Sequence, residues 1–251
     1  PGRSSQAELI ELGGTPTAFS KYGIKFDGIP NTLEPVRRRR SGVQDEGSQL
    51  VAEIFSSVAA NSQRWLDLCA GPGGKAALLS SIAQEAGKDF TANELSQPRA
   101  ELVRQVVGSS RVWVGDGRDI ASHGELFDAV LADVPCTGLG ALRRRPEVRW
   151  RRTVSDLRAL TALQRELSDS AILVLADGGL FAYATCSPHF AETSVAVVDI
   201  LKAHPELEQI DLTAFLPQSI NGAMRGKSLS LWTHRHQCDS MFMAVFRKKS
   251  E

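Results

Sequence analysis

Two of the four cysteines stand in short polar turns, each directly after an apolar stretch. Cys136 belongs to residues 133–138 (DVPCTG), and Cys186 belongs to residues 184–188 (ATCSP). A thiolate adds readily to an electron-poor ring carbon, but a free cysteine has a pKa of about 8.5, so such a site must favour the anion. A lone cysteine after a strand is more often a small buried hydrophobic residue than a nucleophile. Two cysteines in such turns favour nucleophilic chemistry.

A glycine-rich turn and two acids indicate a second function, ligand binding. Residues 71–75 (GPGGK) match neither a Walker loop nor the dinucleotide pattern GxGxxG. Glycines let a ligand approach the backbone, and the first N–H groups of a following helix are free. Glu94 is placed to accept ribose hydroxyls, and Asp116 could receive an adenine amino group.

Each of these three features also has a plainer interpretation. The turn could be a tight connection, Glu94 an exposed carboxylate at a strand end, and Asp116 a turn-forming residue. Together they predict a pocket for an adenine nucleoside with no need for a pyrophosphate. S-adenosylmethionine fits that description.

The elements that must position these residues alternate between strand and helix from residue 64 onward. This order predicts an α/β fold, a mostly parallel sheet with helices on both faces, and ligands at the carboxyl ends of the strands. Polar or reactive residues follow all five expected strands there, including Asp133. The expected strands are 65–69, 90–93, 111–114, 127–132 and 180–185, with two more candidates at 228–232 and 241–246.

Helices are expected between these strands. One begins near Asp45, a good N-cap, and a long one keeps its apolar residues at spacings of three and four over 157–174. We expect Gly178 and Gly179 to end the long helix. Others are expected after the glycine-rich turn, over 100–107 and over 192–203. Residues 1–45 differ in composition and predict a small, loop-rich appendage before a main domain at 46–251.

Composition excludes several classes of protein. The chain has 251 residues, 42% of them apolar, with 29 basic and 29 acidic residues, and a mean hydropathy of −0.15. This argues against disorder and against a membrane-spanning helix, and no signal peptide is recognisable. The cysteines form no CxxC pair, so we expect reduced thiols in a cytoplasmic protein. A metal site at residues 234–239 (HRHQCD) is disfavoured, and a monomer is expected.

Arginines cluster despite the zero net charge. Residues 37–40 are four consecutive arginines, and residues 143–152 hold six arginines against one glutamate. Such runs can bind phosphates, although a solvated charged loop is the commoner explanation of an isolated one. Trp150, inside the second run, could stack on a base, but we favour packing.

Three motifs closely resemble the RsmB/Sun family of RNA cytosine-C5 methyltransferases, in particular the bacterial enzymes that act on small-subunit ribosomal RNA. The motifs are residues 67–75 (DLCAGPGGK), 133–138 (DVPCTG) and 183–187 (YATCS), in the order and strand context of the family. The resemblance covers roughly residues 40–250. It implies a Rossmann-like S-adenosylmethionine-dependent methyltransferase fold with a mostly parallel seven-stranded sheet. Since the resemblance begins only near residue 40, we expect a chain without the family's N-terminal NusB-like domain, in which residues 1–45 would be a remnant of an intervening subdomain.

The resemblance also implies roles for individual residues. Cys186 would be the nucleophile that attacks C6 of a cytosine in 16S ribosomal RNA, Cys136 would aid release, and Asp133 would support protonation at N3. Arginines of the second run would hold the RNA backbone. The implied S-adenosylmethionine pocket consists of Cys69, Ala70, Gly71, Pro72, Gly73, Gly74, Lys75, Glu94, Asp116 and Asp133, and the implied RNA contacts are Arg143, Arg144, Arg145 and Arg149.

Departures from the family pattern and rival functions remain open. Residue 71 is glycine where the family often has alanine, and of the Pro-Glu-Glu-Asn that many members carry after the second cysteine only Glu192 is matched. A transfer RNA substrate is an alternative. A DNA cytosine-C5 methyltransferase would use Cys136 as nucleophile, but no Glu-Asn-Val motif is present. A non-catalytic RNA-binding protein is a further alternative.

Overall fold

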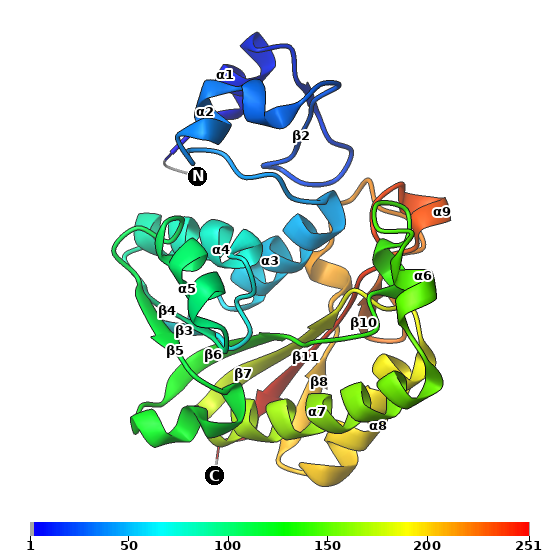
Figure 1. Cartoon of the computed structure of the whole chain (residues 1–251). Helices are drawn as coiled ribbons and strands as arrows, with labels where there is room; N and C mark the ends of the chain where they lie inside the picture. Colours follow the sequence, from blue (N-terminus) through cyan, green and yellow to red (C-terminus); the bar gives the residue numbers. More distant parts are fainter. Residues whose placement is uncertain (1–2, 251) are drawn as a thin grey trace.

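The computed structural model describes residues 3–250. A nine-stranded sheet runs through the molecule in the order β5-β4-β3-β6-β7-β11-β10-β9, with β8 paired to β11 beside this path (Figure 1). Pairing is parallel from β5 to β7 and antiparallel in the remaining pairs. The strands are β3 (Arg64–Asp67), β4 (Asp89–Glu94), β5 (Arg111–Val114), β6 (Phe127–Asp133), β7 (Leu175–Thr185), β8 (Leu207–Ile210), β9 (Met224–Arg225), β10 (Ser228–Ser230) and β11 (Phe242–Lys248).

Helices cover both faces of this sheet, as predicted (Figure 1). Trp65 and Ala129 pack with helices α3, α4 and α5 on one face, whereas Leu66 and Val130 pack with α7 and α8 on the other. Successive strand residues alternate between the two apolar clusters because their side chains point to opposite faces. The helices are α3 (Glu46–Val58), α4 (Gly74–Glu85), α5 (Gln97–Arg104), α6 (Val148–Arg151), α7 (Val154–Leu173), α8 (Ser194–Ala203) and α9 (Thr233–His236).

Two sequence predictions about this sheet are wrong. The sheet is mixed and has nine strands rather than seven, because the short strands β8 and β9 carry no clear apolar alternation and were missed. The long helix ends at Leu173, and Gly178 and Gly179 lie inside β7. The pairing of β6 with β7 is irregular at this point: Phe127 pairs with Leu175 but Ala129 pairs with Leu180. The two glycines therefore belong to a bulged strand and do not stop the helix.

The N-terminal residues form short elements that lie over α3 and α4 (Figure 1). These elements are α1 (Gln6–Glu11), β1 (Thr15–Pro16), β2 (Ile24–Lys25) and α2 (Glu34–Arg37). The first turn of α3 holds them, because the Glu46 carboxylate accepts the N–H groups of Phe19 and Ser20 at 2.6 and 2.8 Å. Asp45 caps α3 by accepting the Gly47 N–H at 3.0 Å, as predicted.

None of the helices between residues 3 and 250 is both long enough and apolar enough to cross a membrane.

Candidate active site

The carboxyl ends of five parallel strands, β3 to β7, bring the predicted site residues to one edge of the sheet. Asp67 is in register with Ala92 of β4 and Leu131 of β6, and Asp133 is in register with Ala184 of β7. The two cysteine turns follow β6 and β7 directly. The sheet thus positions the glycine-rich turn, the acids and both cysteines beside one another, as the sequence predicted.

The two cysteine sulfurs are in contact, with Sγ of Cys136 3.3 Å from Sγ of Cys186. The hydrogen bond between them lowers the pKa of Cys136 and, with burial, raises the pKa of Cys186. The physical cause is that the second S–H donates to the first thiolate, so the pair loses one proton readily and holds the other. One thiolate and one thiol can therefore share this position.

Lys75 brings a positive charge to the sulfurs from the first turn of α4. Its Nζ lies 2.6 Å from Oδ2 of Asp133, and its side chain is buried. Burial disfavours the ammonium ion, but Asp133 outweighs burial and raises the pKa of Lys75. The same charge acts on Cys186, where Lys75 lowers the thiol pKa against the larger raising effects of Cys136 and burial. Within this ion pair, Lys75 favours a thiolate at Cys186, whereas Asp133 opposes it by raising the pKa of Cys186.

The glycine-rich turn and Cys69 just before it lie near several acids. Gly73, the N-cap of α4, lies in the left-handed region at φ 101°, and a Cβ there would lie 2.8 Å from Val106 Cγ2, so glycine is required. Burial, followed by Asp67, Asp133, Glu94 and Asp116, raises the pKa of Cys69 well above its ordinary value. Cys69 consequently stays a thiol in a pocket of negative potential.

Asp67 is the residue of this pocket that the sequence analysis did not include among its site residues. It is 1% exposed, and among the described residues neither of its carboxylate oxygens has a hydrogen-bond partner. Burial and the nearby Asp133 raise its pKa to about 7, against the opposing effect of Lys75. The signal was present, because Asp67 ends β3 immediately before the glycine-rich turn.

Glu94 and Asp116 differ in exposure. Glu94 is buried and accepts the Ser96 N–H at 2.9 Å. Asp116 lies nearer the surface and forms an ion pair with Arg118 at 2.6 Å, which lowers the pKa of Asp116. Both stand at the sheet edge where the adenine nucleoside was expected.

Glu192 proves to be the centre of a buried network behind the cysteines. Its carboxylate accepts hydrogen bonds from the Thr137 N–H at 2.8 Å, the Thr137 hydroxyl at 2.5 Å and the Gln164 amide at 2.9 Å. The Thr137 hydroxyl also contacts the Ser187 hydroxyl at 3.1 Å. Tyr183 completes the network by donating to the Glu192 carbonyl at 2.9 Å. Because Thr137 follows Cys136 and Ser187 follows Cys186, this network sets the spacing of the two turns.

A second junction holds the same turns from another side. The Gly140 N–H donates to the Cys186 carbonyl, and the Ser240 N–H donates to the Gly140 carbonyl, both at 2.9 Å. A Cβ on Gly140 would lie 2.1 Å from the Ser240 oxygen and 2.6 Å from the Cys186 oxygen. Three loops therefore meet at a point that only glycine can occupy.

The predicted RNA-binding arginines divide into two pairs. Arg143 and Arg144 contact Asp45 and Asp239, two carboxylates whose side chains are each 4% exposed. Arg145 forms only a surface pair with Glu147 at 3.5 Å, and the Arg149 guanidinium lies 5.4 Å from the centre of the Trp150 ring. The packing favoured for Trp150 is wrong, because this residue is 81% exposed.

Residues 234–239 form a structural turn. His236 is buried, its Nδ1 accepts the Trp232 N–H at 2.9 Å, and its Nε2 lies 3.0 Å from the Asn221 carbonyl. Across residues 3–250, no group of three or more His, Cys, Asp or Glu side chains is arranged to hold a metal ion.

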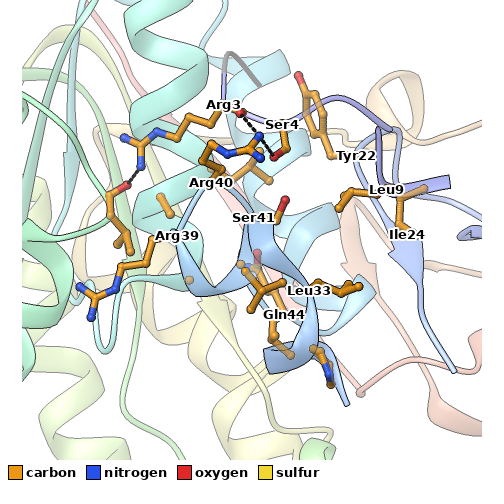
Figure 2. A pocket seen from close by; sticks show the side chains of 18 of the residues that line it. Arg3, Ser4, Leu9, Tyr22, Ile24, Leu33, Arg39, Arg40, Ser41 and Gln44 are labelled. Atoms are coloured by element: carbon orange, nitrogen blue, oxygen red, sulfur yellow. Dashed lines mark hydrogen bonds between the residues drawn. The ribbon is translucent and has the colours of Figure 1, made fainter. Parts of the chain in front are cut away.

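A large cavity of about 1040 Å³ lies outside the glycine-rich turn, between the N-terminal elements and helices α4 and α5. Pro72 and Gly74 form part of its wall. Figure 2 shows Leu9, Tyr22 and Leu33 around it, with Arg3 and Arg40 at one end. Arg40 is neutralised there by Glu8 and Glu34. The cavity thus borders the glycine-rich turn at Pro72 and Gly74.

Comparison with known proteins identifies the family. The family model for the 16S rRNA methyltransferase RsmB/F matches residues 58–247. The chain belongs to the RsmB/F family. It is 46% identical over 99% of its length to "Putative methyltransferase Rv1407" of Mycobacterium tuberculosis (strain H37Rv), covering 55% of that protein. It is 35% identical over 80% of its length to ribosomal RNA small subunit methyltransferase B of Pseudomonas putida, covering 47% of it.

Solved structures agree on the fold. The crystal structure of PH0851 matches 98% of this RsmB/F chain with a TM-score of 0.85 and 25% identity, covering 57% of that chain. NSun6 from Pyrococcus horikoshii with SFG matches 91% with a TM-score of 0.73 and 22% identity, covering 58% of that chain. The fold is therefore the S-adenosylmethionine-dependent methyltransferase fold. The chain spans about half the length of the curated relatives it matches.

The site fits the cofactor of this fold. S-adenosylmethionine carries a positive sulfonium and a positive ammonium group, and Asp67, Glu94 and Asp116 stand at the ends of neighbouring strands. Asp67 keeps both carboxylate oxygens unpartnered among the described residues. A buried carboxylate without a partner is costly, so a cationic ligand is the natural complement of this pocket.

Proposed function

We propose that this chain transfers a methyl group from S-adenosylmethionine to C5 of a cytosine in RNA, and that the RNA is 16S ribosomal RNA. Residues 46–251 would form the catalytic domain, with residues 1–45 as an appendage. The observation that carries the proposal is the contact of Cys136 with Cys186 at 3.3 Å, beside the buried Lys75–Asp133 ion pair. A cytosine ring needs both a nucleophile at C6 and a polar group at N3, and Cys186 and Asp133 are the residues that we propose for these roles.

Cys186 is the proposed nucleophile. Its thiolate forms a bond to C6, and the C5–C6 double bond supplies the electron pair that makes C5 nucleophilic. Asp133 lies beside Lys75 and would support protonation at N3 as that negative charge develops. When bound, S-adenosylmethionine supplies an electrophilic methyl group for C5. Lys75 favours the Cys186 thiolate, but the contact with Cys136, burial and Asp133 raise the pKa of Cys186 by more, so in the resting pair Cys136 loses its proton first and Cys186 must give up its own proton before it attacks.

Cys136 is the proposed aid to release. After methylation, C5 must lose its proton, the C5–C6 double bond must reform, and the sulfur of Cys186 must leave with the bonding pair. The contact between the two sulfurs places Cys136 beside the carbon–sulfur bond that breaks. Bonding of Cys186 to carbon removes the S–H that lowers the pKa of Cys136. The proposed role of Cys136 therefore rests on its position beside Cys186, from which its sulfur would accept the C5 proton. The target base must leave its stack to reach these groups.

The proposed cofactor pocket consists of residues 69–75, Glu94, Asp116 and Asp133. Glu94 would accept the ribose hydroxyls, and Asp116 would receive the adenine amino group. The negative potential that raises the pKa of Cys69 supports a cationic ligand at this place. The exposed Arg145 and Arg149 are the proposed contacts to the RNA backbone.

A covalent-trapping assay tests these roles. Wild type, Cys136→Ala, Cys186→Ala and the double variant are incubated with S-adenosylmethionine and small-subunit ribosomal RNA, and a protein–RNA band is sought on a denaturing gel. A band with Cys136→Ala that disappears in the double variant would support attack by Cys186 and release by Cys136. A band that requires Cys136 would reverse the roles and favour the DNA-type mechanism. Transfer RNA in parallel reactions distinguishes the two RNA substrates.

A further inference from the structure

Three side chains from separate segments form a stack beside the cysteine turns. The Arg225 guanidinium lies 4.8 Å from the centre of the Phe190 ring and 5.2 Å from the centre of the Trp232 ring. Phe190 belongs to the 3₁₀ turn that follows the Cys186 motif, Arg225 to β9, and Trp232 to the start of α9. We refer to Phe190, Arg225 and Trp232 as the aromatic–arginine stack.

The stack lies at the same edge of the sheet as the cysteines. Ser230, two residues before Trp232, pairs with Phe242 of β11, which in turn pairs with Thr185 just before Cys186. The hydroxyl of Thr233 contacts that of Ser240 at 3.2 Å, and Ser240 is bonded to Gly140 at the three-loop junction. The same strand pairs and loop hydrogen bonds therefore connect the aromatic–arginine stack to the segments that carry the two cysteines.

The exposure and charge of the stack do not suit a purely structural role. Phe190 is 63% exposed, although a phenylalanine that serves packing is normally buried. Among residues 3–250, Arg225 forms no ion pair with a carboxylate, in contrast to Arg143 and Arg144. An exposed ring beside an uncompensated guanidinium is chemically complementary to a nucleotide, which has a flat base and an anionic phosphate.

We infer that the aromatic–arginine stack is a binding surface for single-stranded RNA, where Phe190 stacks on a base next to the target cytosine and Arg225 contacts its phosphate. The inference rests on the proposed function, because removal of a cytosine from its stack uncovers the faces of its neighbours. Phe190 replaces the lost stacking partner. Trp232 supports the guanidinium from the other side and is a positioning residue.

Binding of fluorescein-labelled single-stranded RNA of about 12 nucleotides with one central cytosine tests this. Base–aromatic stacking predicts that Phe190→Ala raises Kd about 5- to 150-fold. Phe190→Tyr keeps the ring and should bind as wild type. Leu173→Ala is the control for loss of exposed apolar surface, since Leu173 is 67% exposed at the end of α7. Arg225→Gln should lower the salt dependence of binding by about one counterion, whereas Phe190→Ala should leave it unchanged.

RNA molecules that each lack one base identify the base on which Phe190 stacks. RNA with an abasic nucleotide next to the cytosine should bind wild type and Phe190→Ala equally well, because the stacking partner is gone. Equal binding of intact RNA by wild type and Phe190→Ala would overturn the inference and leave a protein partner as the occupant of this face. No RNA binding by wild type would also overturn it.

The trapping assay separates this inference from the proposed function. If the covalent band forms but neither Phe190→Ala nor the abasic RNA changes Kd, the reaction stands and the stack is not an RNA site. If Phe190→Ala weakens binding but no variant traps RNA, the stack binds RNA and the cysteine mechanism is wrong.

Discussion

Glu192 and Asp67 are both buried carboxylates, and they lie on the two sides of the candidate site. Glu192, behind the cysteines, accepts three hydrogen bonds from Thr137 and Gln164. Asp67, beneath the glycine-rich turn, accepts none among the described residues, and its pKa rises to about 7. The protein itself therefore supplies the hydrogen-bond donors that Glu192 needs. The carboxylate oxygens of Asp67 remain as acceptors for a ligand.

The difference has a physical consequence. A satisfied network holds the attacking groups in one geometry before the substrate arrives, which lowers the entropy cost of reaction. An unsatisfied buried acid destabilises the ligand-free fold and is relieved by a bound cation. We propose that the cysteine side is built for positioning and that the glycine-rich side is built for tight, charge-dependent binding.

The largest expected effect is that of Asp67→Asn on the pH dependence of stability. The pKa of Asp67 is about 7 in the folded chain against an ordinary 3.8, so the fold favours the protonated acid and loses stability as pH rises through this range. This loss amounts to on the order of 4 kcal/mol at pH 8. Asp67→Asn should therefore be stabilised relative to wild type by roughly 3 kcal/mol more at pH 8 than at pH 5, as measured by urea unfolding at both values.

Asp116→Asn is the matched control at the same edge. Arg118 lowers the pKa of Asp116, so this acid stabilises the fold above its ordinary pKa and the benefit is lost as pH falls. Its replacement should show the same small effect at pH 5 and pH 8, because the benefit is lost only as pH falls below the ordinary pKa of 3.8. S-adenosylmethionine should stabilise wild type more at pH 8 than at pH 5, and an identical pH profile for wild type and Asp67→Asn would contradict the comparison.

The second effect concerns the hydrogen-bond network of Glu192. Glu192→Ala leaves three donors without an acceptor, which should cost roughly 3 kcal/mol of unfolding free energy. For a chain of this size the loss corresponds to a Tm lower by roughly 6–12 °C. Glu192→Gln is the control, because its amide oxygen can still accept from Thr137 N–H and Gln164 while its NH₂ donates to the Thr137 hydroxyl. Equal Tm values for the two variants would show that the network does not hold the cysteine turns.

The third effect concerns the three-loop junction. Gly140→Ala would force a methyl group against the carbonyls of Ser240 and Cys186, and overpacking of this kind costs about 1–3 kcal/mol. Because the Cys186 backbone must move, kcat should fall by more than stability alone explains. Gly42→Ala is the control, since nothing lies within 4 Å of a Cβ there. Full activity of Gly140→Ala would show that the spacing of the sulfurs tolerates this displacement.

The sequence predicted those parts of the site that depend on local order. Glu94, Asp133 and Cys186 were recognisable as site residues because each stands at the carboxyl end of a strand, and a parallel sheet places all carboxyl ends at one edge. Both cysteines were expected at this edge, and the structure adds that their sulfurs lie 3.3 Å apart. The capping residue Asp45 was also recognisable, because N-cap preference is local.

Partners distant along the chain were not predictable. Arg144 and Asp239 are separated by 95 positions, and nothing in their local sequence indicates the pair. The full burial of Asp67 without a partner depends on three neighbouring strands at once. Gly178 and Gly179 fitted a helix stop equally well as a strand bulge, because both conformations favour glycine. Tertiary packing decides such cases.

The smallest effects separate the arginines that the sequence treated alike. Arg144→Ala leaves the buried Asp239 without its bidentate partner, which should cost about 1–3 kcal/mol of unfolding free energy. Arg145 is 61% exposed and pairs only with Glu147, so Arg145→Ala should change stability by less than about 0.5 kcal/mol. Its effect should fall instead on RNA affinity, with a salt dependence smaller by about one counterion. If Arg144→Ala also kept its stability and lost only RNA affinity, the ion pairs with Asp45 and Asp239 would not be structural, and the basic segment would act as one RNA-binding surface.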